Sequence, residues 1–553
     1  MSNSFIVECL DCGNRSSFSI AQPACPACGS LWREARYDLN GLKNRLYDLV
    51  KQRPFDIWRY QELLPLSAPN RSISLGEGGT PLIHATNLGM MLGNPNLFIK
   101  DERQGPTASF KDRQASITVA ALKEANIHEF VIASTGNVAI SYSAYAARAS
   151  IKLWAFLTSL VPAAKMREVA IYGTQVIKIT GSYDQAKQVA SDFARQRGLS
   201  IDLGARTLTC IESMKTIAYE VAEQLAHLQP SSSGPWRAPD WYIQAVSGGM
   251  GPIGVLKGFR ELYDMGLIDK VPKIAAIQAE GCAPMVHAWK QNKDTATPVQ
   301  HPQTLIATLA TGNPGRTYSL LRQKMLENSG GTIESVSDAE AFRAMHYLAK
   351  MEGFSVEPAA AVAFAGLVKL VRNGVIAPHE TVVINCTGHT MPIERNILGE
   401  GWSREVTLPS SMEEGNEEGL LAALTKVSVD RFPRIAIVDD NPDVRRLIRR
   451  ILQTQGNYTL FEATNGREAL TIAKNERPNL IILDLMMPEM DGFSVIQELE
   501  KDPETSQIPV IVVTAKELTP AEKDRLRGHI QTLMQKGDFL SDELLDEVRA
   551  LLG

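Results

Sequence analysis

The chain has 553 residues, of which 44% are hydrophobic and 22% charged, with a net charge of −5 at neutral pH. This composition supplies enough apolar material for large cores, and the length predicts about three or four folding units. The acidic balance does not indicate a nucleic-acid-binding surface. No apolar run approaches the ~20 residues that cross a bilayer, and residues 1–8 carry no signal sequence, so we expect a cytoplasmic protein.

The first expected element is a small segment rich in cysteine and glycine at residues 1–32. It holds two CxxC pairs, and each pair can direct two thiolates at one ion, so together they predict a structural zinc site: Cys9, Cys12, Cys25 and Cys28. The alternative to a zinc site is four free thiols at the protein surface. A redox role is disfavoured because neither pair lies at a strand-to-helix junction. The three remaining cysteines are scattered, which does not suggest a disulfide framework.

After a mixed extension at 33–75, with an amphipathic stretch near 37–51, residues 76–405 alternate short apolar runs with helical patterns. We expect strands at 130–133, 152–156 and 175–179, and helices at about 138–148, 163–171 and 183–197. Such alternation predicts an α/β fold with a largely parallel sheet.

Lys111 lies in the stretch 106–113 (PTASFKDR), where a helical pattern begins. A lysine there is ordinarily a surface charge, whereas a lysine that forms a Schiff base must be held in place and kept deprotonated. This stretch, with GEGGTPL at 76–82, closely resembles fold-type II pyridoxal-phosphate (PLP) enzymes, and threonine synthases in particular. The resemblance implies a tryptophan synthase β-like fold of two α/β subdomains, PLP as cofactor, and Lys111 as the Schiff-base lysine and catalytic base.

A second loop, 134–137, sits between an expected strand and an expected helix. Unpaired amides at a helix N-terminus favour an anion, although a plain helix cap would carry the same residues. The resemblance assigns the substrate α-carboxylate to Ser134, Thr135 and Gly136. It assigns the ring hydroxyl of the cofactor to Asn137.

A glycine-rich loop follows an expected strand at 241–246: Ser247, Gly248, Gly249, Met250 and Gly251. Such a loop can cradle a phosphate with its amides, and the resemblance makes it the phosphate cup of PLP. Met250 stands where the family usually has glycine, so a positive φ at that position would strain the backbone. The sequence TGH at 387–389 matches the family as well, and the resemblance assigns to Thr387 the hydroxyl that meets the pyridine nitrogen.

Threonine synthases act on phosphohomoserine and need a second anion site for its phosphate. Aligned on Lys215 and Thr216, the family's ligands for that phosphate fall on Gly204, Ala205, Cys210 and Gly251. Losing one charge-assisted donor typically weakens binding of the phosphate by about 1.5–3 kcal/mol. Arg206 and Lys165 are candidates to replace the missing donors. The sequence therefore predicts β- or γ-elimination or replacement on an amino acid. Cysteate synthase-like and Ser/Thr dehydratase-like reactions are the alternatives to a threonine synthase-like one.

An acidic stretch rich in Ser, Gly and Asn marks a linker at 406–432, after which β/α alternation restarts. Three expected strands end in polar groups at Asp439 and Asp440, at Asp484, and at Thr514. Carboxyl ends of parallel strands share one edge, where Mg²⁺ would offset the repulsion between acids.

This last region resembles the receiver domains of response regulators, which have a doubly wound, flavodoxin-like fold. The resemblance makes Asp484 the phosphoacceptor and assigns Mg²⁺ to Asp439, Asp440, Asp484 and the carbonyl of Met486. It places Thr514 and Lys536 at the phosphoryl oxygens. Leu533 stands where many receivers carry the switch aromatic.

The predicted organisation is a zinc ribbon (1–32), an extension (33–75), a PLP-dependent catalytic domain (76–405), a linker (406–432) and a receiver domain (433–553). The first hypothesis is a PLP lyase or synthase that is tuned or localised by phosphorylation of Asp484. A PLP-binding signalling protein without catalysis is the second, and a receiver that serves only as a tether is the third. We expect an amino-acid substrate, a sensor histidine kinase or phosphotransfer protein, and a homodimer, with no nucleic-acid or membrane partner.

Overall fold

The computed structural model describes residues 5–43, 45–134, 136–158, 161–180, 183–229, 235–389, 433–455, 458–516, 518–526, 528–535 and 541–552. The predicted linker, Thr135 and Lys536 lie outside these residues. The chain forms two compact units: residues 1–85, 96–345 and 355–393, and residues 86–95, 346–354 and 394–553. Within the described part, no helix is both long enough and apolar enough to span a bilayer.

The N-terminal ribbon is an antiparallel sheet in the order β2-β1-β3, with β1 at Phe5–Cys9, β2 at Arg15–Ser16 and β3 at Arg33–Tyr37. The sheet thus continues past the predicted boundary at residue 32. The next helices, α1 (Leu39–Lys43) and α2 (Leu46–Lys51), place Leu42, Leu46 and Val50 in the main hydrophobic core of the first unit. The extension therefore shares the core of the catalytic part.

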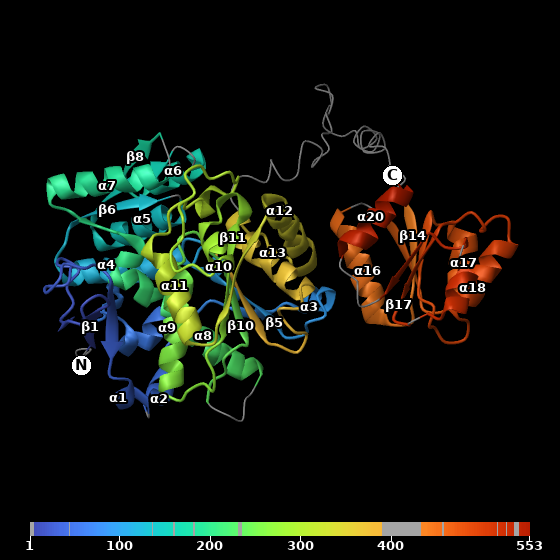
Figure 1. Cartoon of the computed structure of the whole chain (residues 1–553), viewed down its shortest axis with the longest axis horizontal. Helices are drawn as coiled ribbons and strands as arrows, with labels where there is room; N and C mark the ends of the chain where they lie inside the picture. Colours follow the sequence, from blue (N-terminus) through green and yellow to red (C-terminus); the bar gives the residue numbers. More distant parts are fainter. Residues whose placement is uncertain are drawn as a thin grey trace, which may run out of the picture. The chain divides into compact units, whose positions relative to one another are not determined.

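The smaller catalytic sheet is parallel and runs β8-β7-β6-β9: Gln175–Ile179, Lys152–Thr158, Glu129–Ser134 and Ser200–Ile201. One face packs on α4 (Lys111–Glu124), α5 (Asn137–Ala149) and α6 (Ala163–Ile171). The other face packs on α7 (Tyr183–Arg197) through small apolar residues such as Ala190 (Figure 1). Strands covered on both faces are rich in apolar residues, which is why their sequences read as continuous hydrophobic runs.

The larger sheet runs β12-β11-β10-β13-β5-β4: Gly331–Val336, Lys273–Ala279, Trp241–Ala245, Val382–Cys386, Leu97–Asp101 and Leu82–His84. All neighbours are parallel except β4, which pairs antiparallel with β5. One face is covered by α8 (Leu208–Leu228), α9 (Met250–Asp264), α10 (Pro284–Lys290) and α11 (Arg316–Glu327).

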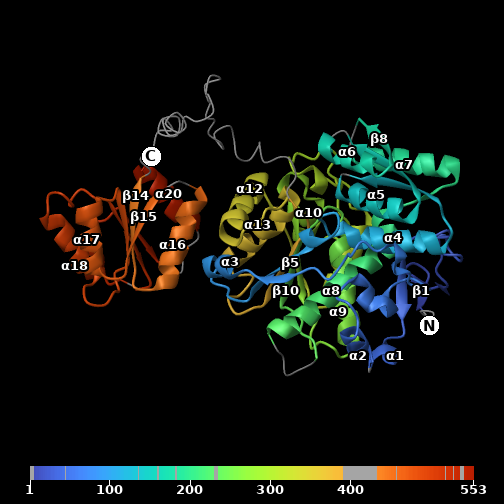
Figure 2. The same cartoon turned by 180° about the vertical axis from the view of Figure 1, so that it is seen from behind.

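On the opposite face lies α13 (Pro358–Arg372), with α12 (Asp338–Tyr347) beside it (Figure 2). Helix α13 consists largely of alanine, valine and leucine and is apolar on most sides, which is typical of a helix buried within a core. Pro358 occupies its first turn, where the missing N–H costs nothing.

Helices α8 and α9 pack unusually closely because two glycines of α9 face α8. A Cβ added to Gly254 would lie 2.4 Å from the carbonyl oxygen of Ile211, and one on Gly258 would lie 2.5 Å from that of Lys215. Because α9 begins at Met250, within the glycine-rich loop 247–251, this packing also fixes where that loop ends.

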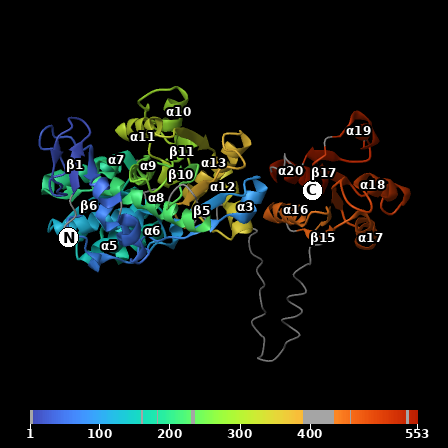
Figure 3. The same ribbon diagram turned by 90° about the horizontal axis from the view of Figure 1, so that it is seen from below.

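The receiver sheet is parallel in the order β15-β14-β16-β17-β18: Thr459–Ala463, Arg434–Val438, Leu480–Leu483, Val510–Thr514 and Thr532–Gln535. This is the flavodoxin-like strand order. One face packs on α16 (Pro442–Gln455) and α20 (Ser541–Leu552). The other packs on α17 (Gly466–Glu476), α18 (Gly492–Lys501) and α19 (Pro520–Leu526), as Figure 3 shows.

Replacing Gly258 with alanine should push α9 away from α8 and lower the free energy of unfolding by about 1–3 kcal/mol, the usual cost of overpacking. Chemical denaturation of the Gly258→Ala variant measures this loss. Lys123→Ala, at an exposed helical position of α4, is the control and should stay within about 0.5 kcal/mol of the unsubstituted chain. Equal stability of both variants would contradict the close packing.

Candidate functional site

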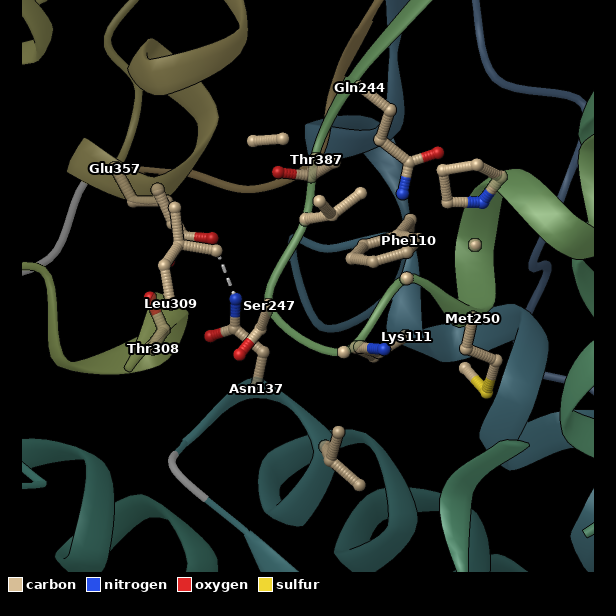
Figure 4. Close-up of a pocket in the computed structure, with 18 residues that line it drawn as sticks. Phe110, Lys111, Asn137, Gln244, Ser247, Met250, Thr308, Leu309, Glu357 and Thr387 are labelled. Carbon is tan, nitrogen blue, oxygen red and sulfur yellow. Dashed lines mark hydrogen bonds between the residues drawn. The ribbon is translucent and has the colours of Figure 1, made fainter. Parts of the chain in front are cut away.

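A pocket lies where β10 and β13 give way to loops (Figure 4). Its walls include the first residues of α4, α5 and α9, the first turn of α13, and Thr308 and Leu309. Ligands of open parallel α/β sheets commonly bind at this end of the strands. The pocket brings together predicted residues that are far apart in the sequence: Lys111, Asn137, Ser247, Gly248, Gly249, Met250, Gly251 and Thr387.

The loop that carries Lys111 is joined through its backbone to the segment after β13. The amide of Phe110 donates to the carbonyl of Thr387 at 3.1 Å, and the amide of His389 donates to the carbonyl of Ala108 at 3.1 Å. Ala108 has a φ of +56°, in the left-handed region that favours glycine. These contacts hold Lys111 and Thr387 in one rigid corner of the pocket.

The Lys111 amine is the reactive group of this corner. Its Nζ donates to Gln114 Oε1 at 3.3 Å. Burial lowers the pKa of Lys111 below its ordinary value, and the nearby carboxylates of Asp202 and Glu357 only partly offset this. A larger fraction of the amine is therefore neutral at a given pH than for a solvated lysine.

Arg113 anchors the first turn of α4 behind Lys111. Its guanidinium is buried and donates to both carboxylate oxygens of Glu102, at 2.7 and 2.8 Å, and to both of Glu220, at 2.5 and 2.8 Å. Lys100 Nζ donates to Glu220 Oε2 at 2.6 Å. Paired charges of this kind hold their partners in a narrow range of geometries.

The 134–137 loop forms the N-terminus of α5. Gly136 is the helix cap, with a φ of +141°. Ser134 is buried, and its hydroxyl accepts from the amides of Gly136 at 3.0 Å and of Ala139 at 3.1 Å. The oxygen of the Ser134 hydroxyl therefore holds the loop, while its own O–H can still donate to an anion at this helix N-terminus.

The side-chain amide of Asn137 is held through both its nitrogen and its oxygen. Its Nδ2 donates to Glu357 Oε1 at 2.8 Å, the bond drawn in Figure 4, and its Oδ1 accepts from Lys165 Nζ. Lys165 is buried, which lowers its pKa, and its Nζ lies 3.8 Å from Glu357 Oε2. Because Nδ2 carries two N–H groups, Asn137 keeps one donor for a ligand.

The glycine-rich loop leads from β10 into α9, which begins at Met250. Gly249 is the cap of α9 and has a φ of +84°, whereas Met250 has no positive φ. The strain considered for Met250 is therefore absent, because the glycine before it adopts the left-handed conformation. The unpaired amides of the first turn of α9 form a place for an anion.

Four residues line the same pocket although the sequence analysis gave them no role in binding: Gln244, Thr308, Leu309 and Glu357. The signal that could have found Glu357 is its place directly before a proline at the start of a helix. Gln244 sits inside a strand, where a single polar residue has no local signature of binding.

The positions aligned with the family's substrate-phosphate ligands differ in their surroundings. Gly204 and Ala205 belong to a short 3-10 turn, Gly204–Arg206, and do not line the pocket. Cys210 is buried, with its Sγ 3.5 Å from Asp202 Oδ1 and 3.6 Å from the Tyr142 hydroxyl. Burial raises the pKa of Cys210, so this group is a neutral thiol. Gly251 alone of the four lies at the pocket.

The predicted zinc cysteines converge in the ribbon. All four Sγ atoms lie within 4.8 Å of one another, with Cys9 and Cys28 at 3.6 Å and Cys12 and Cys25 at 3.7 Å. A tetrahedral ion with Zn–S bonds of about 2.3 Å separates its sulfurs by roughly 3.8 Å. The four thiols therefore have the spacing that one zinc ion requires.

The receiver carboxylates also converge. Oxygens of Asp439, Asp440 and Asp484 lie within 4.8 Å of one another at the ends of β14 and β16. The amide of Met486 donates to Asp484 Oδ1 at 3.1 Å, which holds the loop after β16 against this carboxylate. Thr514 ends the neighbouring β17 and is buried. Leu533 lies in β18 and is 37% exposed.

Comparisons with known proteins agree with this arrangement. The family described as pyridoxal-phosphate dependent enzyme matches residues 73–388, and the response regulator receiver domain matches residues 435–549. The threonine synthase of Methanocaldococcus jannaschii is 34% identical over 384 residues, which cover 69% of this chain and 91% of that protein. The threonine synthase of Methanosarcina acetivorans is 33% identical, with 71% and 93% covered.

Among solved structures, diaminopropionate ammonia lyase from Escherichia coli superposes with a TM-score of 0.51 at 15% identity, covering 65% of this chain and 92% of that one. This likeness shows the fold, a fold-type II PLP enzyme. The chain therefore belongs to the pyridoxal-phosphate dependent enzymes, as a relative of the threonine synthases that also carries a response regulator receiver domain.

Proposed function

We propose that the chain catalyses an elimination or replacement reaction on an amino acid with a leaving group at its β- or γ-carbon, with Lys111 as the catalytic base. The observation that carries this proposal is the amine of Lys111, with its lowered pKa, in a pocket between two helix N-termini. One N-terminus suits the carboxylate of an amino acid, and the other suits a phosphate.

The residues of the pocket fit PLP. The amine of Lys111, the amides at the start of α9, the free donor of Asn137 and the hydroxyl of Thr387 offer partners for the aldehyde carbon, the phosphate, the ring hydroxyl and the ring nitrogen, in that order. When bound, PLP supplies an electron sink for negative charge at the substrate α-carbon.

The residues of the chain perform three tasks. Amides at the start of α5 hold the substrate carboxylate and so orient the α-carbon. Nζ of Lys111 takes the proton from the α-carbon, for which its neutral form is required. Lys165 and Glu357 fix the amide of Asn137, which keeps its remaining donor directed at the ligand.

Threonine synthase-like chemistry is the first candidate, because the relatives that match most of the catalytic part bear that name. A cysteate synthase-like β-replacement is the second. The neutral thiol of Cys210 beside Asp202 argues against phosphohomoserine as the substrate, because neither group can hold its phosphate. A Ser/Thr dehydratase-like elimination, the third candidate, needs no distal anion site.

A substrate panel tests these candidates. Purified, PLP-loaded protein is offered phosphohomoserine, phosphoserine, serine, threonine and O-acetylserine, each with water or sulfite as nucleophile. Phosphate release from phosphohomoserine supports a threonine synthase, whereas turnover of another amino acid alone supports one of the other reactions. No turnover of any amino acid would refute the enzymatic proposal and favour a PLP-binding signalling protein.

Replacing Lys111 with alanine should abolish turnover and the absorbance of lysine-bound PLP, because Lys111 is the one lysine among the described residues that line the pocket. In cofactor-free protein, the rate at which Lys111 takes up PLP should rise with pH as the amine loses its proton, with a midpoint below 10.5, the ordinary lysine value. Lys123→Ala, on the exposed side of α4, serves as the control. A midpoint at or above the ordinary value would contradict the lowered pKa.

We also propose that the ribbon holds one structural zinc ion on Cys9, Cys12, Cys25 and Cys28. The ribbon is connected to the catalytic core, since Lys257 Nζ donates to the carbonyl of Ala35 at 2.6 Å and the Tyr37 hydroxyl donates to Glu212 Oε2 at 2.9 Å. Metal binding would therefore stabilise β3 and, through it, the α8–α9 pair.

Elemental analysis should find one zinc ion per chain, and Cys12→Ser should lose the ion together with several degrees of thermal stability. Cys210→Ala should retain it, because that thiol lies outside the ribbon cluster. Zinc retained by Cys12→Ser, or lost by Cys210→Ala, would contradict the assignment.

For the receiver, we propose that Asp484 accepts a phosphoryl group from a sensor histidine kinase or phosphotransfer protein. Asp439, Asp440, Asp484 and the Met486 carbonyl would hold Mg²⁺, which needs a few oxygen ligands plus water. Thr514 and Lys536 would meet the phosphoryl oxygens. Phosphorylation would then change the output of the PLP site or the location of the enzyme.

Acetyl phosphate with Mg²⁺ should phosphorylate the unsubstituted chain and Asp443→Ala, whose exposed carboxylate lies outside the acidic cluster, but not Asp484→Ala. Turnover of the best amino-acid substrate should differ between the phosphorylated and unphosphorylated forms. Equal turnover would sink the regulatory proposal and leave the receiver as a tether.

A further inference from the structure

Gln244 is a buried amide that has an anchored end and an open end. The residue is 1% exposed, and its Oε1 accepts from the Tyr242 hydroxyl at 2.9 Å and from Asn385 Nδ2 at 3.5 Å. Asn385 Nδ2 also donates to the Tyr242 hydroxyl at 2.8 Å. This chain of donors sets the direction of the amide, with oxygen toward Tyr242.

The nitrogen of Gln244 faces the pocket. Figure 4 shows the side chain projecting from β10 with its nitrogen at the end nearer Phe110. Among the described residues, Nε2 donates no hydrogen bond, and the side chain lines the pocket. A ligand that accepts from this N–H group would supply the hydrogen bond that the described residues do not provide.

Gly251 leaves room for this amide. A Cβ at position 251 would lie 2.3 Å from Gln244 Nε2, so any other residue there would displace the side chain. Gly251 is the second residue of α9, and the helix cap at Gly249 leaves the amides of this first turn open toward an anion. Nε2 therefore stands beside the backbone donors of α9 and adds a side-chain donor to them.

We infer that Gln244 belongs to the phosphate-binding site and donates its side-chain N–H to a phosphate monoester held at the N-terminus of α9. The inference rests on the proposed function, in which PLP brings that phosphate. A phosphorylated amino acid is the other source of the same chemical group. Gly251 has its small size, on this view, because a side chain at this position would displace the amide of Gln244.

The test compares PLP with pyridoxal, which lacks the phosphate, on cofactor-free protein. Gln244→Ala should weaken PLP binding roughly 10- to 100-fold and leave pyridoxal binding nearly unchanged. Gln244→Glu, which keeps the shape of the side chain, should weaken PLP binding further because a carboxylate repels the phosphate. Gln323→Ala, an exposed glutamine of α11, is the matched control.

A double-mutant cycle checks the contact with Gly251. Gly251→Ala should weaken PLP binding in the presence of Gln244, by displacing its amide, and have little further effect after Gln244→Ala. Additive effects would contradict the shared role. Thermal unfolding of each cofactor-free variant shows that the substitutions leave the fold intact.

Further outcomes separate the two phosphates. Unchanged PLP affinity with weakened binding of phosphohomoserine, but not of homoserine, would assign the donor to the substrate phosphate. Inorganic phosphate should stabilise the cofactor-free chain against heat, and Gln244→Ala should lose this effect, whatever the fate of the proposed function. If no phosphate compound distinguishes Gln244→Ala from the unsubstituted chain, the inference is overturned, although PLP-dependent turnover can still be intact.

Discussion

The catalytic part depends on one buried cluster of charges, formed by Lys100, Glu102, Arg113 and Glu220. All are nearly inaccessible to solvent and come from β5, the turn after it, α4 and α8. Removing an ion from water costs several kcal/mol, so each charge is tolerated only with its partners in place. Because Arg113 is two residues from Lys111, the geometry that satisfies this cluster also sets the position of the reactive amine. The same requirement joins the smaller sheet, through α4, to the larger one.

Much of the fold follows from local patterns. The helices predicted at 163–171 and 183–197 and the strand at 175–179 coincide with α6, α7 and β8. Alternating apolar strands and amphipathic helices leave little ambiguity in a parallel α/β sheet. The end of the ribbon was harder to predict, because β3 has the polar sequence REARY, which lacks an apolar strand pattern. Its place is decided by tertiary contacts, such as those of Ala35 and Tyr37 with Glu212 and Lys257, which no local pattern displays.

In the candidate site, too, some features could be predicted from the sequence and others could not. Loops at the ends of predicted strands could be found from sequence, since parallel strands gather their carboxyl ends at one edge. What each side chain does there depends on residues distant in the chain. Asn137 is oriented by Lys165 and Glu357, and Gln244 by Tyr242 and Asn385. The Ser134 hydroxyl, at the end of β6, accepts from the amides of Gly136 and Ala139 and so holds the start of α5 before any substrate arrives.

The left-handed backbone at Ala108 has a consequence for the entropy of the lysine loop. An alanine in this conformation carries strain of about 1 kcal/mol or more, which a glycine would avoid. Glycine, however, has more freedom in the unfolded chain and so loses more on folding, by roughly the same amount. The strain of alanine and the extra entropy loss of glycine therefore contribute nearly equally to the free energy of unfolding. The loop with alanine, however, is stiffer than a loop with glycine would be. With alanine, the loop has few alternative conformations, so the amine of Lys111 keeps its position in the pocket between turnovers.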